Sequence, residues 1–321
     1  MRFLTYDELA PDMDLDRTLI HLAAFFGTFP RRSVELWRRR SKAYSDYVAV
    51  FAEEKGRVLG QVFVLRIPYT FPGGTEIIGG IAAVGTRPDR GRSGVARAVL
   101  SEVHRRERES GIRYTALWTN RSWGAHGLYE KLGYRDVYSS PWVVHGGIPT
   151  RRKGARSFLL RAARREDLLD IERFHAQQTE GRLGFSPRAV GFLRTAAAAG
   201  ELDPVKELIV ARRAGRLVGY VHLEQNAFRT FSGELVATTR AIRRELISAV
   251  GHAAKGLPFA FQHTPVTDDP DLFAGGGFAT SPRGWYGLMG HDLQGAWSPR
   301  EALRQFATED PRFSCMSGDR F

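Results

Sequence analysis

The pattern of apolar and polar positions divides the sequence into short strands and amphipathic helices. Apolar and polar residues alternate over residues 47–53 and 57–65, and Glu54-Lys55-Gly56 between them predicts a hairpin of two half-buried strands. Residues 77–84 are apolar on both faces, which is typical of a strand in the interior of a sheet. Helical spacing of apolar residues predicts a long helix over residues 93–110. We therefore expect an α/β fold.

The other expected elements are short. The glycines Gly79, Gly80 and Gly85 indicate a bulge or a close backbone approach in the central strand. Aromatic side chains of the two first helices are expected in the core rather than in contact with a substrate: Phe25, Phe26, Phe29 and Trp37. The same patterns predict strands at residues 2–6 and 114–119, helices at 16–26, 30–44, 120–133, 240–254 and 299–306, and a loop at 68–74.

The sequence contains an internal repeat at one constant offset. Residues 50–62 resemble residues 209–221, and three pairs are identical: Gly56 and Gly215, Arg57 and Arg216, Gly60 and Gly219. Residues 128–134 resemble residues 272–278, with Phe273 where the first copy has Tyr129. We infer two tandem domains, residues 1–150 and 151–297, followed by a tail of residues 298–321.

Composition places the chain among globular proteins. Of its 321 residues 43% are apolar and 26% are charged, and this length suits two domains. No apolar run reaches the length of a membrane span, and no signal peptide is visible at the start, so we expect a cytoplasmic protein with no membrane partner. The single cysteine, Cys315, excludes a disulfide within the chain and a cysteine-rich metal site, and we predict no metal.

The net charge of +12 is concentrated in two stretches. Residues 87–113 contain eight arginines and four acids, and residues 151–165 contain seven basic residues and no acid. A basic surface can bind nucleic acid or a polyanionic small molecule. Since no nucleic-acid motif or pattern of stacking aromatics accompanies the charge, nucleic acid is the less favoured partner.

A glycine-containing turn follows the central strand almost at once. It reads Arg90-Gly91-Arg92-Ser93-Gly94-Val95-Ala96 and leads into the long helix. The first N–H groups of a helix have no partner within the helix, and together with the helix dipole they bind phosphate oxygens. We expect Ser93 to be the N-cap, and Gly94 to let a ligand's phosphates approach the backbone.

This turn and a second motif resemble the GCN5-related N-acetyltransferases, the GNAT superfamily. Gly91-Arg92-Ser93-Gly94-Val95-Ala96 is similar to the family's acyl-CoA loop, Gln/Arg-x-x-Gly-x-Gly/Ala, although Gly91 replaces Gln or Arg. Leu128-Tyr129-Glu130-Lys131-Leu132-Gly133-Tyr134 is similar to the family's Leu-Tyr-Glu-Lys-Leu-Gly-Phe signature. Two motifs in this order predict two tandem GNAT-like domains, each a mixed, mainly antiparallel sheet flanked by helices.

The resemblance implies that acetyl-CoA is the cosubstrate and that the central strand diverges from the next one to admit it. Tyr129 would be the general acid that protonates the CoA thiolate, and a tyrosine is protonated at neutral pH because its pKa is about 10. The family's Asn seven residues before this tyrosine is replaced by Ser122, with Asn120 close by. The cofactor-binding residues implied are Val84, Gly85, Thr86, Arg92, Ser93, Gly94, Val95, Ala96, Arg97, Asn120 and Ser122.

An active domain, a degenerate second copy and a C-terminal Phe together resemble the Eis family of tandem acetyltransferases. The resemblance implies that the carboxylate of Phe321 acts as the catalytic base. The family also has a third domain, for which we expect no room in this chain. Glu76 and His126 are alternative bases, and transfer of the amine proton directly to solvent is a further alternative. The second copy has Phe273 and no glycine turn, so we expect it to be inactive.

The sequence thus predicts an N-acetyltransferase that transfers acetyl from acetyl-CoA to a primary amine by direct attack. A non-catalytic CoA-binding or regulatory module is the alternative from another class, and a nucleic-acid-binding protein is the third hypothesis. The identity of the acceptor amine and the presence of a homo-oligomer stay open.

Overall fold

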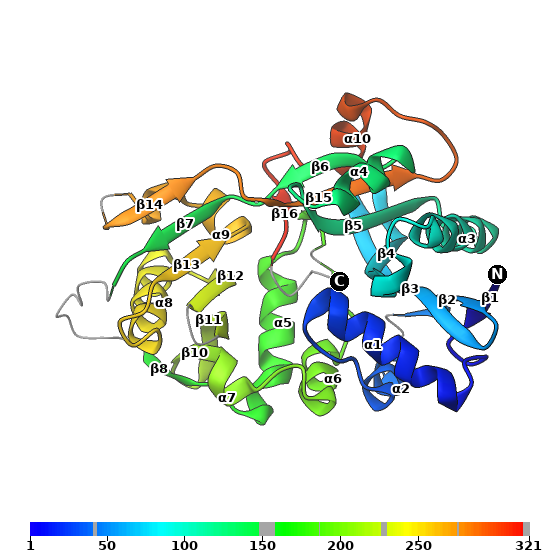
Figure 1. The fold of residues 1–321 in the computed structure, drawn as a ribbon. Coiled ribbons are helices and arrows are strands. Elements are labelled where there is room, and N and C mark those ends of the chain that lie inside the picture. The colour runs from blue at the N-terminus through cyan, green and yellow to red at the C-terminus, as the bar shows by residue number, and fades with distance from the viewer. Residues whose placement is uncertain (41–43, 148–157, 186, 226–229, 275, 317–321) are drawn as a thin grey trace. The chain divides into compact units, whose positions relative to one another are not determined.

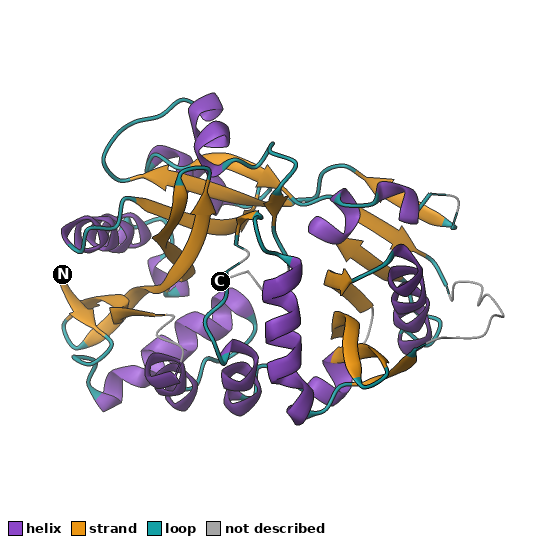
Figure 2. Cartoon of the chain, turned by 180° about the vertical axis from the view of Figure 1, so that it is seen from behind, coloured by secondary structure: helices purple, strands orange, loops and turns teal. Residues whose placement is uncertain are grey.

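The computed structural model describes residues 1–40, 44–147, 158–185, 187–225, 230–274 and 276–316 (Figure 1). They form two compact units. The first unit comprises Met1–Tyr138 and Tyr286–Thr308, and the second comprises Ser139–Trp285 and the described part of Glu309–Arg320. Each unit contains a mixed sheet with helices against it, as expected for two tandem GNAT-like domains (Figure 2).

The sheet of the first unit has the strand order β1-β2-β3-β4-β5-β15-β6. Every pairing for which a register is given is antiparallel except that of β4 with β5, which is parallel. The strands are β1 (Arg2–Thr5), β2 (Tyr44–Glu54), β3 (Arg57–Phe71), β4 (Gly74–Thr86), β5 (Tyr114–Asn120), β6 (Arg135–Ser139) and β15 (Tyr286–Asp292).

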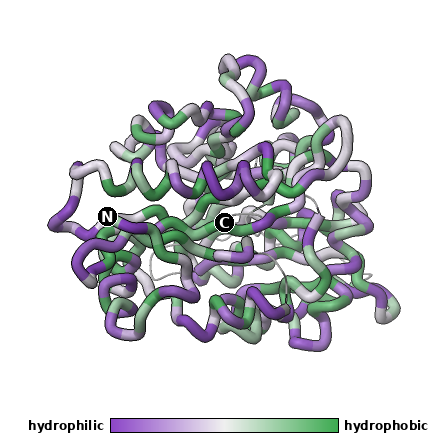
Figure 3. Tube along the Cα trace, turned by 90° about the vertical axis from the view of Figure 1, so that its right-hand side faces the viewer, coloured by the Kyte–Doolittle hydropathy of each residue, from purple (hydrophilic) through white to green (hydrophobic). Residues whose placement is uncertain are grey.

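Helices cover both faces of this sheet, and each face has its own apolar cluster. Ile20 of α1 packs with Phe51 and Phe63 on one face, and Val99 of α3 packs with Val62 and Ile81 on the other. The helices show hydrophilic and hydrophobic colours in turn along their length, as amphipathic helices do (Figure 3). They are α1 (Asp14–Phe25), α2 (Arg31–Arg40), α3 (Val95–Glu109), α4 (Gly124–Lys131) and α10 (Pro299–Phe306), with a 3₁₀ turn at Pro11–Met13.

The sheet of the second unit has the strand order β14-β7-β13-β12-β11-β10-β8, and only β12 with β13 is parallel. β16 pairs with β9 in parallel, outside this strand order. The strands are β7 (Trp142–His145), β8 (Leu159–Ala162), β9 (Leu183–Gly184), β10 (Leu208–Arg213), β11 (Arg216–Gln225), β12 (Thr230–Ala237), β13 (Phe259–Gln262), β14 (Phe278–Ser281) and β16 (Phe313–Ser314). The helices are α5 (Leu168–Gln178), α6 (Phe192–Ala199), α7 (Pro204–Glu207), α8 (Arg240–Ala253) and α9 (Thr264–Thr267), with 3₁₀ turns at Arg165–Asp167 and Pro270–Leu272.

Two strands lie in a different unit from the one that their sequence position suggests. The predicted domains 1–150 and 151–297 place β7 in the first domain and β15 in the second. In the structure β15 lies between β5 and β6 in the first sheet, and β7 lies between β13 and β14 in the second. The tail is divided as well, since α10 belongs to the first unit and β16 to the second.

Most of the expected elements are present, with local corrections. The helix predicted at 299–306 is α10, but the loop predicted at 68–74 is wrong, because β3 continues through Pro68 to Phe71 and pairs with β4. Of the aromatic residues expected in the core, Trp37 is buried and Phe29 packs against the core cluster, whereas Phe25 and Phe26 are exposed.

The internal repeat corresponds to two hairpins of the same geometry. Gly56 and Gly215 have φ angles of 77° and 79° in the two turns, a conformation that glycine adopts without strain. Gly60 and Gly219 let a helix approach the sheet: a Cβ at Gly60 would lie 2.6 Å from Cγ1 of Val95, and one at Gly219 would lie 2.9 Å from Cγ2 of Ile242. Both contacts are with residues near the start of α3 or α8.

Candidate functional site

The parallel pair β4–β5 of the first unit ends early. Its pairs are Gly79↔Thr115, Gly80↔Ala116 and Ile81↔Leu117, although β4 continues to Thr86 and β5 to Asn120. Among these described residues β4 and β5 share no further pair. Backbone N–H and C=O groups of β4 after Ile81 and of β5 after Leu117 are therefore not used in bonds between the two strands. The pairing thus stops before Val84, Gly85 and Thr86, which agrees with the divergence that the family resemblance implies.

A β-bulge coincides with this divergence. Gln61 pairs with Gly85 and Phe63 pairs with Ala82, so Val62 lies opposite both Ala83 and Val84. Ala83 has a φ angle of 47°, a left-handed conformation that is uncommon outside glycine. Bulges bend a strand and redirect its backbone groups, and they recur next to active sites.

The loop between β4 and α3 exposes the backbone amides expected to bind phosphate. The loop includes a 3₁₀ turn at Pro88–Arg90, and α3 begins at Val95. The first amide of this helix to donate within it is that of Ala98, which bonds to the carbonyl of Gly94 at 3.0 Å. The N–H groups of Val95, Ala96 and Arg97 therefore have no helical partner and are available to an anion.

The cap of this helix differs from the prediction in one residue. Gly94, with a φ angle of 85°, is the N-cap, and no side chain caps the helix. Ser93 instead donates its hydroxyl to the carbonyl of Arg90 at 2.6 Å. Arg92 also has a positive φ, of 60°, and Arg92, Ser93, Gly94 and Arg97 are exposed. Since no side-chain oxygen occupies the helix start, the amides stay open to a ligand.

Tyr129 lies in α4 and belongs to the same apolar cluster as Ile81 and Leu117, the last pair before β4 and β5 diverge. The tyrosine is 6% exposed, and burial raises its pKa to about 12. No residue in the described part of the chain hydrogen-bonds its hydroxyl. Tyr129 is therefore a protonated phenol with a free donor close to the diverging strands.

Asn120 and Ser122 form a turn at the end of β5. The side-chain carbonyl of Asn120 accepts from the N–H of Ser122 at 2.9 Å and from its hydroxyl at 2.8 Å. The amide NH₂ of Asn120 takes part in neither bond. The helix predicted to start here begins later, at Gly124.

The candidate bases differ in their surroundings. Nε2 of His126 lies 3.2 Å from Asp136, and its Nδ1 lies 3.6 Å from Glu130. Glu76 is an exposed residue of β4. Phe321 lies outside the described residues, although the tail is buried as far as Phe313, Ser314, Cys315 and Met316.

The second unit repeats the short parallel pairing without the loop. β12 pairs with β13 only from Thr230 to Ser232, and Thr238 and Thr239 alone connect β12 to α8. The side chain of Thr239 caps this helix by accepting from the N–H of Ile242 at 3.3 Å. In its first turn, Arg240 pairs with Asp269 at 2.9 Å. The start of α8 is thus occupied by a cap and an ion pair.

The residue in the place of Tyr129 is also changed. Phe273 is 1% exposed and packs in the apolar cluster that covers β12 and β13, with its ring 5.3 Å from that of Phe261. It has no hydroxyl to donate.

Comparison with known proteins assigns the first unit to a family. Residues 8–137 match the family model described as an acetyltransferase (GNAT) domain. The first unit carries a GNAT domain. The diverging strands, the open helix start and the buried phenol are all parts of this domain, and the GNAT fold supports acyl transfer, generally from acetyl-CoA. No curated protein sequence matches the chain.

Solved structures have the fold of the whole chain. A probable N-acyltransferase from Enterococcus faecalis matches with a TM-score of 0.67 and 13% identity, over 95% of this chain and 73% of that one. Eis1 from Mycobacterium abscessus matches with a TM-score of 0.57 and 17% identity, over 91% and 74%. A tandem GNAT protein from the clavulanic acid biosynthesis pathway matches with a TM-score of 0.57 and 14% identity, over 92% and 99%. These likenesses show the tandem GNAT fold.

Some residues around the site were missed by the sequence analysis. Gly79, Gly80 and Gly85 indicated a bulge in this strand, but they did not indicate that Ala83 would have the positive φ. Gly60, which lets Val95 approach the sheet, was visible as an identity of the repeat, but its role was not. The side chains of Asp16 and Arg87 meet next to the loop, and two charged residues so far apart in sequence give no local signal. No helix in the described ranges is both long and apolar enough to cross a membrane.

Proposed function

We propose that the first unit transfers the acetyl group of acetyl-CoA to a primary amine by direct attack, with Tyr129 as the general acid. The observation that carries the proposal is that buried Tyr129 packs in the same apolar cluster as Ile81 and Leu117, the last pair before β4 and β5 stop pairing. The amides of Val95, Ala96 and Arg97 and the side chain of Arg92 would hold the pyrophosphate. The β4 edge at Val84, Gly85 and Thr86 and the free amide of Asn120 would hold the pantetheine arm, with Ser122 fixing the Asn120 side chain.

Each chemical requirement has a group in this arrangement. Backbone N–H groups of the diverging β4 edge stabilise negative charge that develops on the carbonyl oxygen. The bond from the amine nitrogen to the carbonyl carbon forms, the carbon–sulfur bond breaks, and Tyr129 donates its hydroxyl proton to the sulfur. The amine proton goes to a base or to solvent, and the Phe321 carboxylate is the base that we propose. Glu76, which is exposed, and His126, whose Nε2 lies 3.2 Å from Asp136, stay the alternative bases.

Release of CoA thiol across a panel of primary amines tests the proposal. The only cysteine, Cys315, is fully buried, so the native protein contributes little background to a thiol reagent. We expect the wild type to release thiol with at least one amine, and Tyr129→Phe to bind acetyl-CoA but lose turnover. Binding without transfer to any amine would instead support a CoA-binding module, and absence of binding would overturn the proposal. Removing Phe321 tests the base separately.

A further inference from the structure

Asp16, in the first turn of α1, is buried with both carboxylate oxygens hydrogen-bonded. Oδ1 accepts from Nη2 of Arg57 at 2.7 Å and from Nη1 of Arg87 at 2.8 Å. Oδ2 accepts from Nε of Arg57 at 2.8 Å and from the backbone N–H of Val58 at 3.0 Å. Hydrogen bonds from Arg57 hold the pKa of Asp16 below its usual value, so this buried group is a carboxylate at neutral pH.

Arg87 is the residue at which β4 passes into the β4–α3 loop. Its backbone N–H donates to the carbonyl of Leu59 at 2.9 Å, and its own carbonyl accepts from Arg90 at 2.9 Å. Its side chain bridges Asp16 and Asp89, with Nε 2.9 Å from Asp89. Because Asp89 belongs to the loop itself, the bond to Asp16 is the one that connects this side chain to another part of the domain among the residues that the structure describes.

The rest of the loop is hydrogen-bonded within itself, including the bond from the Ser93 hydroxyl to the carbonyl of Arg90 at 2.6 Å. Its internal backbone bonds include those from Gly91 to Pro88 and from Ser93 to Arg90, both at 3.4 Å. At the far end Val95 is buried against Gly60. The position of the helix-start amides therefore depends on Val95 at the exit of the loop and on Arg87 at its entry.

We propose that Asp16 is a positioning residue for coenzyme A: acting through Arg87, it holds the β4–α3 loop where its amides meet the pyrophosphate. This inference rests on the proposed function, because it assumes that the loop binds CoA. An amide in place of the carboxylate would remove the charge that pairs Arg87, and the loop entry would then be held by backbone bonds alone. The loss is expected in binding of the phosphate half and not in acetyl transfer itself.

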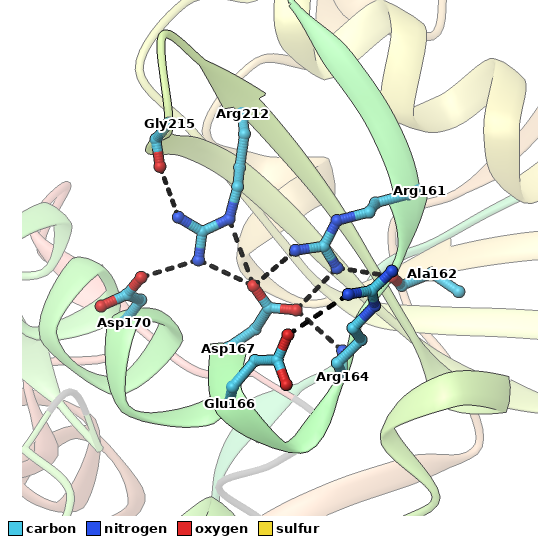
Figure 4. A network of polar contacts seen from close by, with 8 residues as sticks. All are labelled: Arg161, Ala162, Arg164, Glu166, Asp167, Asp170, Arg212 and Gly215. Carbon is cyan, nitrogen blue, oxygen red and sulfur yellow. Dashed lines mark hydrogen bonds and ion pairs between the residues drawn. The ribbon is translucent and has the colours of Figure 1, made fainter.

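The second unit supplies a matched carboxylate (Figure 4). Asp167 is also buried and accepts from two arginines, Arg161 at 2.7 Å and Arg212 at 2.7 Å, and from the backbone N–H of Arg164 at 2.8 Å. Its partners lie on β8, on β10 and at the start of the 3₁₀ turn, and none of them is a residue of the β12–α8 connection. Loss of either carboxylate should destabilise its unit, but only the loss of Asp16 should affect CoA.

The experiment compares wild type, Asp16→Asn and Asp167→Asn in the full chain. Calorimetric titration with CoA measures affinity, and turnover is measured with acetyl-CoA and with S-acetylpantetheine, which has no pyrophosphate. We expect Asp16→Asn to weaken CoA binding and raise the KM for acetyl-CoA about tenfold, the value of one charge-assisted hydrogen bond. We expect kcat and the rate with S-acetylpantetheine to stay within about twofold, because the acetyl-transfer groups are untouched. Asp167→Asn should bind CoA like the wild type.

The outcomes separate this inference from the proposed function. If wild type does not bind CoA, the proposed function fails. If wild type binds and Asp16→Asn binds equally well, only the inference is overturned, and equal weakening by Asp167→Asn overturns it too. If Asp16→Asn does not fold, Arg87→Met replaces it: the same loss of CoA affinity supports the inference, and unchanged affinity contradicts it.

Discussion

Both units of the chain contain two parallel strands that pair over only three residues. In the first unit a loop with positive φ at Arg92 and Gly94 leads to a helix start without a side-chain cap. In the second unit Thr239 caps the helix directly, and Phe273 replaces the phenol. The sheet and its short parallel pairing are thus shared scaffold, and what we propose as chemistry depends on one loop and one hydroxyl.

The largest expected effect comes from exchanging the two aromatic residues. Tyr129→Phe should lower kcat by about 10²- to 10⁴-fold, the usual range for loss of a general acid, with little change in acetyl-CoA affinity. Phe273→Tyr should not restore turnover to that variant, because the second unit has no phosphate loop. Steady-state thiol release checks both. A Tyr129→Phe enzyme with more than a third of the wild-type kcat would remove this tyrosine from the mechanism.

The next largest effect distinguishes the β4–α3 loop from an ordinary hairpin turn, that of β10–β11. Gly94 and Gly215 have φ angles of 85° and 79°, and a Cβ on either would meet no atom within 4 Å. Alanine at either position should destabilise the chain by about 1 kcal/mol, because the left-handed conformation is unfavourable with a Cβ. Only Gly94→Ala should also weaken CoA binding, about tenfold or more, as the helix-start amides shift. Titration and thermal denaturation of both variants measure this, and equal CoA affinities would show that the loop does not bind phosphate.

A smaller effect tests the shared scaffold. Gly60→Ala and Gly219→Ala should each cost about 1–3 kcal/mol of unfolding free energy, because the new Cβ overlaps Val95 or Ile242. The KM for acetyl-CoA should rise with Gly60→Ala alone, since Val95 starts the helix that binds the phosphates. Chemical denaturation combined with kinetics gives both quantities. A raised KM for Gly219→Ala would contradict the assignment of the site to the first unit.

The smallest effect is a difference in pH dependence. Burial lowers the pKa of His104 to about 3 and that of His291 to about 4 in the first unit, so both stay neutral while the unfolded chain takes up protons below about pH 6.5. The stability that they contribute is complete above pH 6.5 and is lost as the pH falls, by about 1 kcal/mol per histidine at pH 5.5.

His222 in the second unit should respond in the opposite direction. Its burial acts to lower the pKa, but Glu207 and the charge of Glu234 raise it overall. Its contribution is therefore present below the unfolded pKa and is lost as the pH rises through the folded one. Hydrogen exchange at pH 7.5 and pH 5.5 should show protection decreasing on acidification for α3 and β15, and not for β11. Equal changes in protection for α3, β15 and β11 would be evidence against this difference in pH dependence between the two units.

The sequence predicted the parts of the molecule that depend on neighbours along the chain. Alternation and Gly56 gave the hairpin β2–β3, its repeat gave β10–β11, and two motifs located Tyr129 and the β4–α3 loop. The N-cap was placed one residue early, because Ser93 bonds to a carbonyl within the loop instead of capping the helix.

Long-range pairing could not be read from the sequence. β15 joins β5 through residues far away in the chain, and its apolar pattern would suit either sheet. The same holds for Asp16, an acid on a helix whose partners are known only once the hairpin and the end of β4 come together. Whether the Phe321 carboxylate is the base stays a prediction, because that residue lies outside the described ranges.

The most direct test of the central claim is the stoichiometry of acetyl-CoA binding to the full chain by isothermal titration calorimetry. The account predicts one site per chain, weakened by Gly94→Ala and unaffected by Thr239→Ala at the start of α8. Two sites per chain, or one site that responds to Thr239→Ala and not to Gly94→Ala, would contradict it.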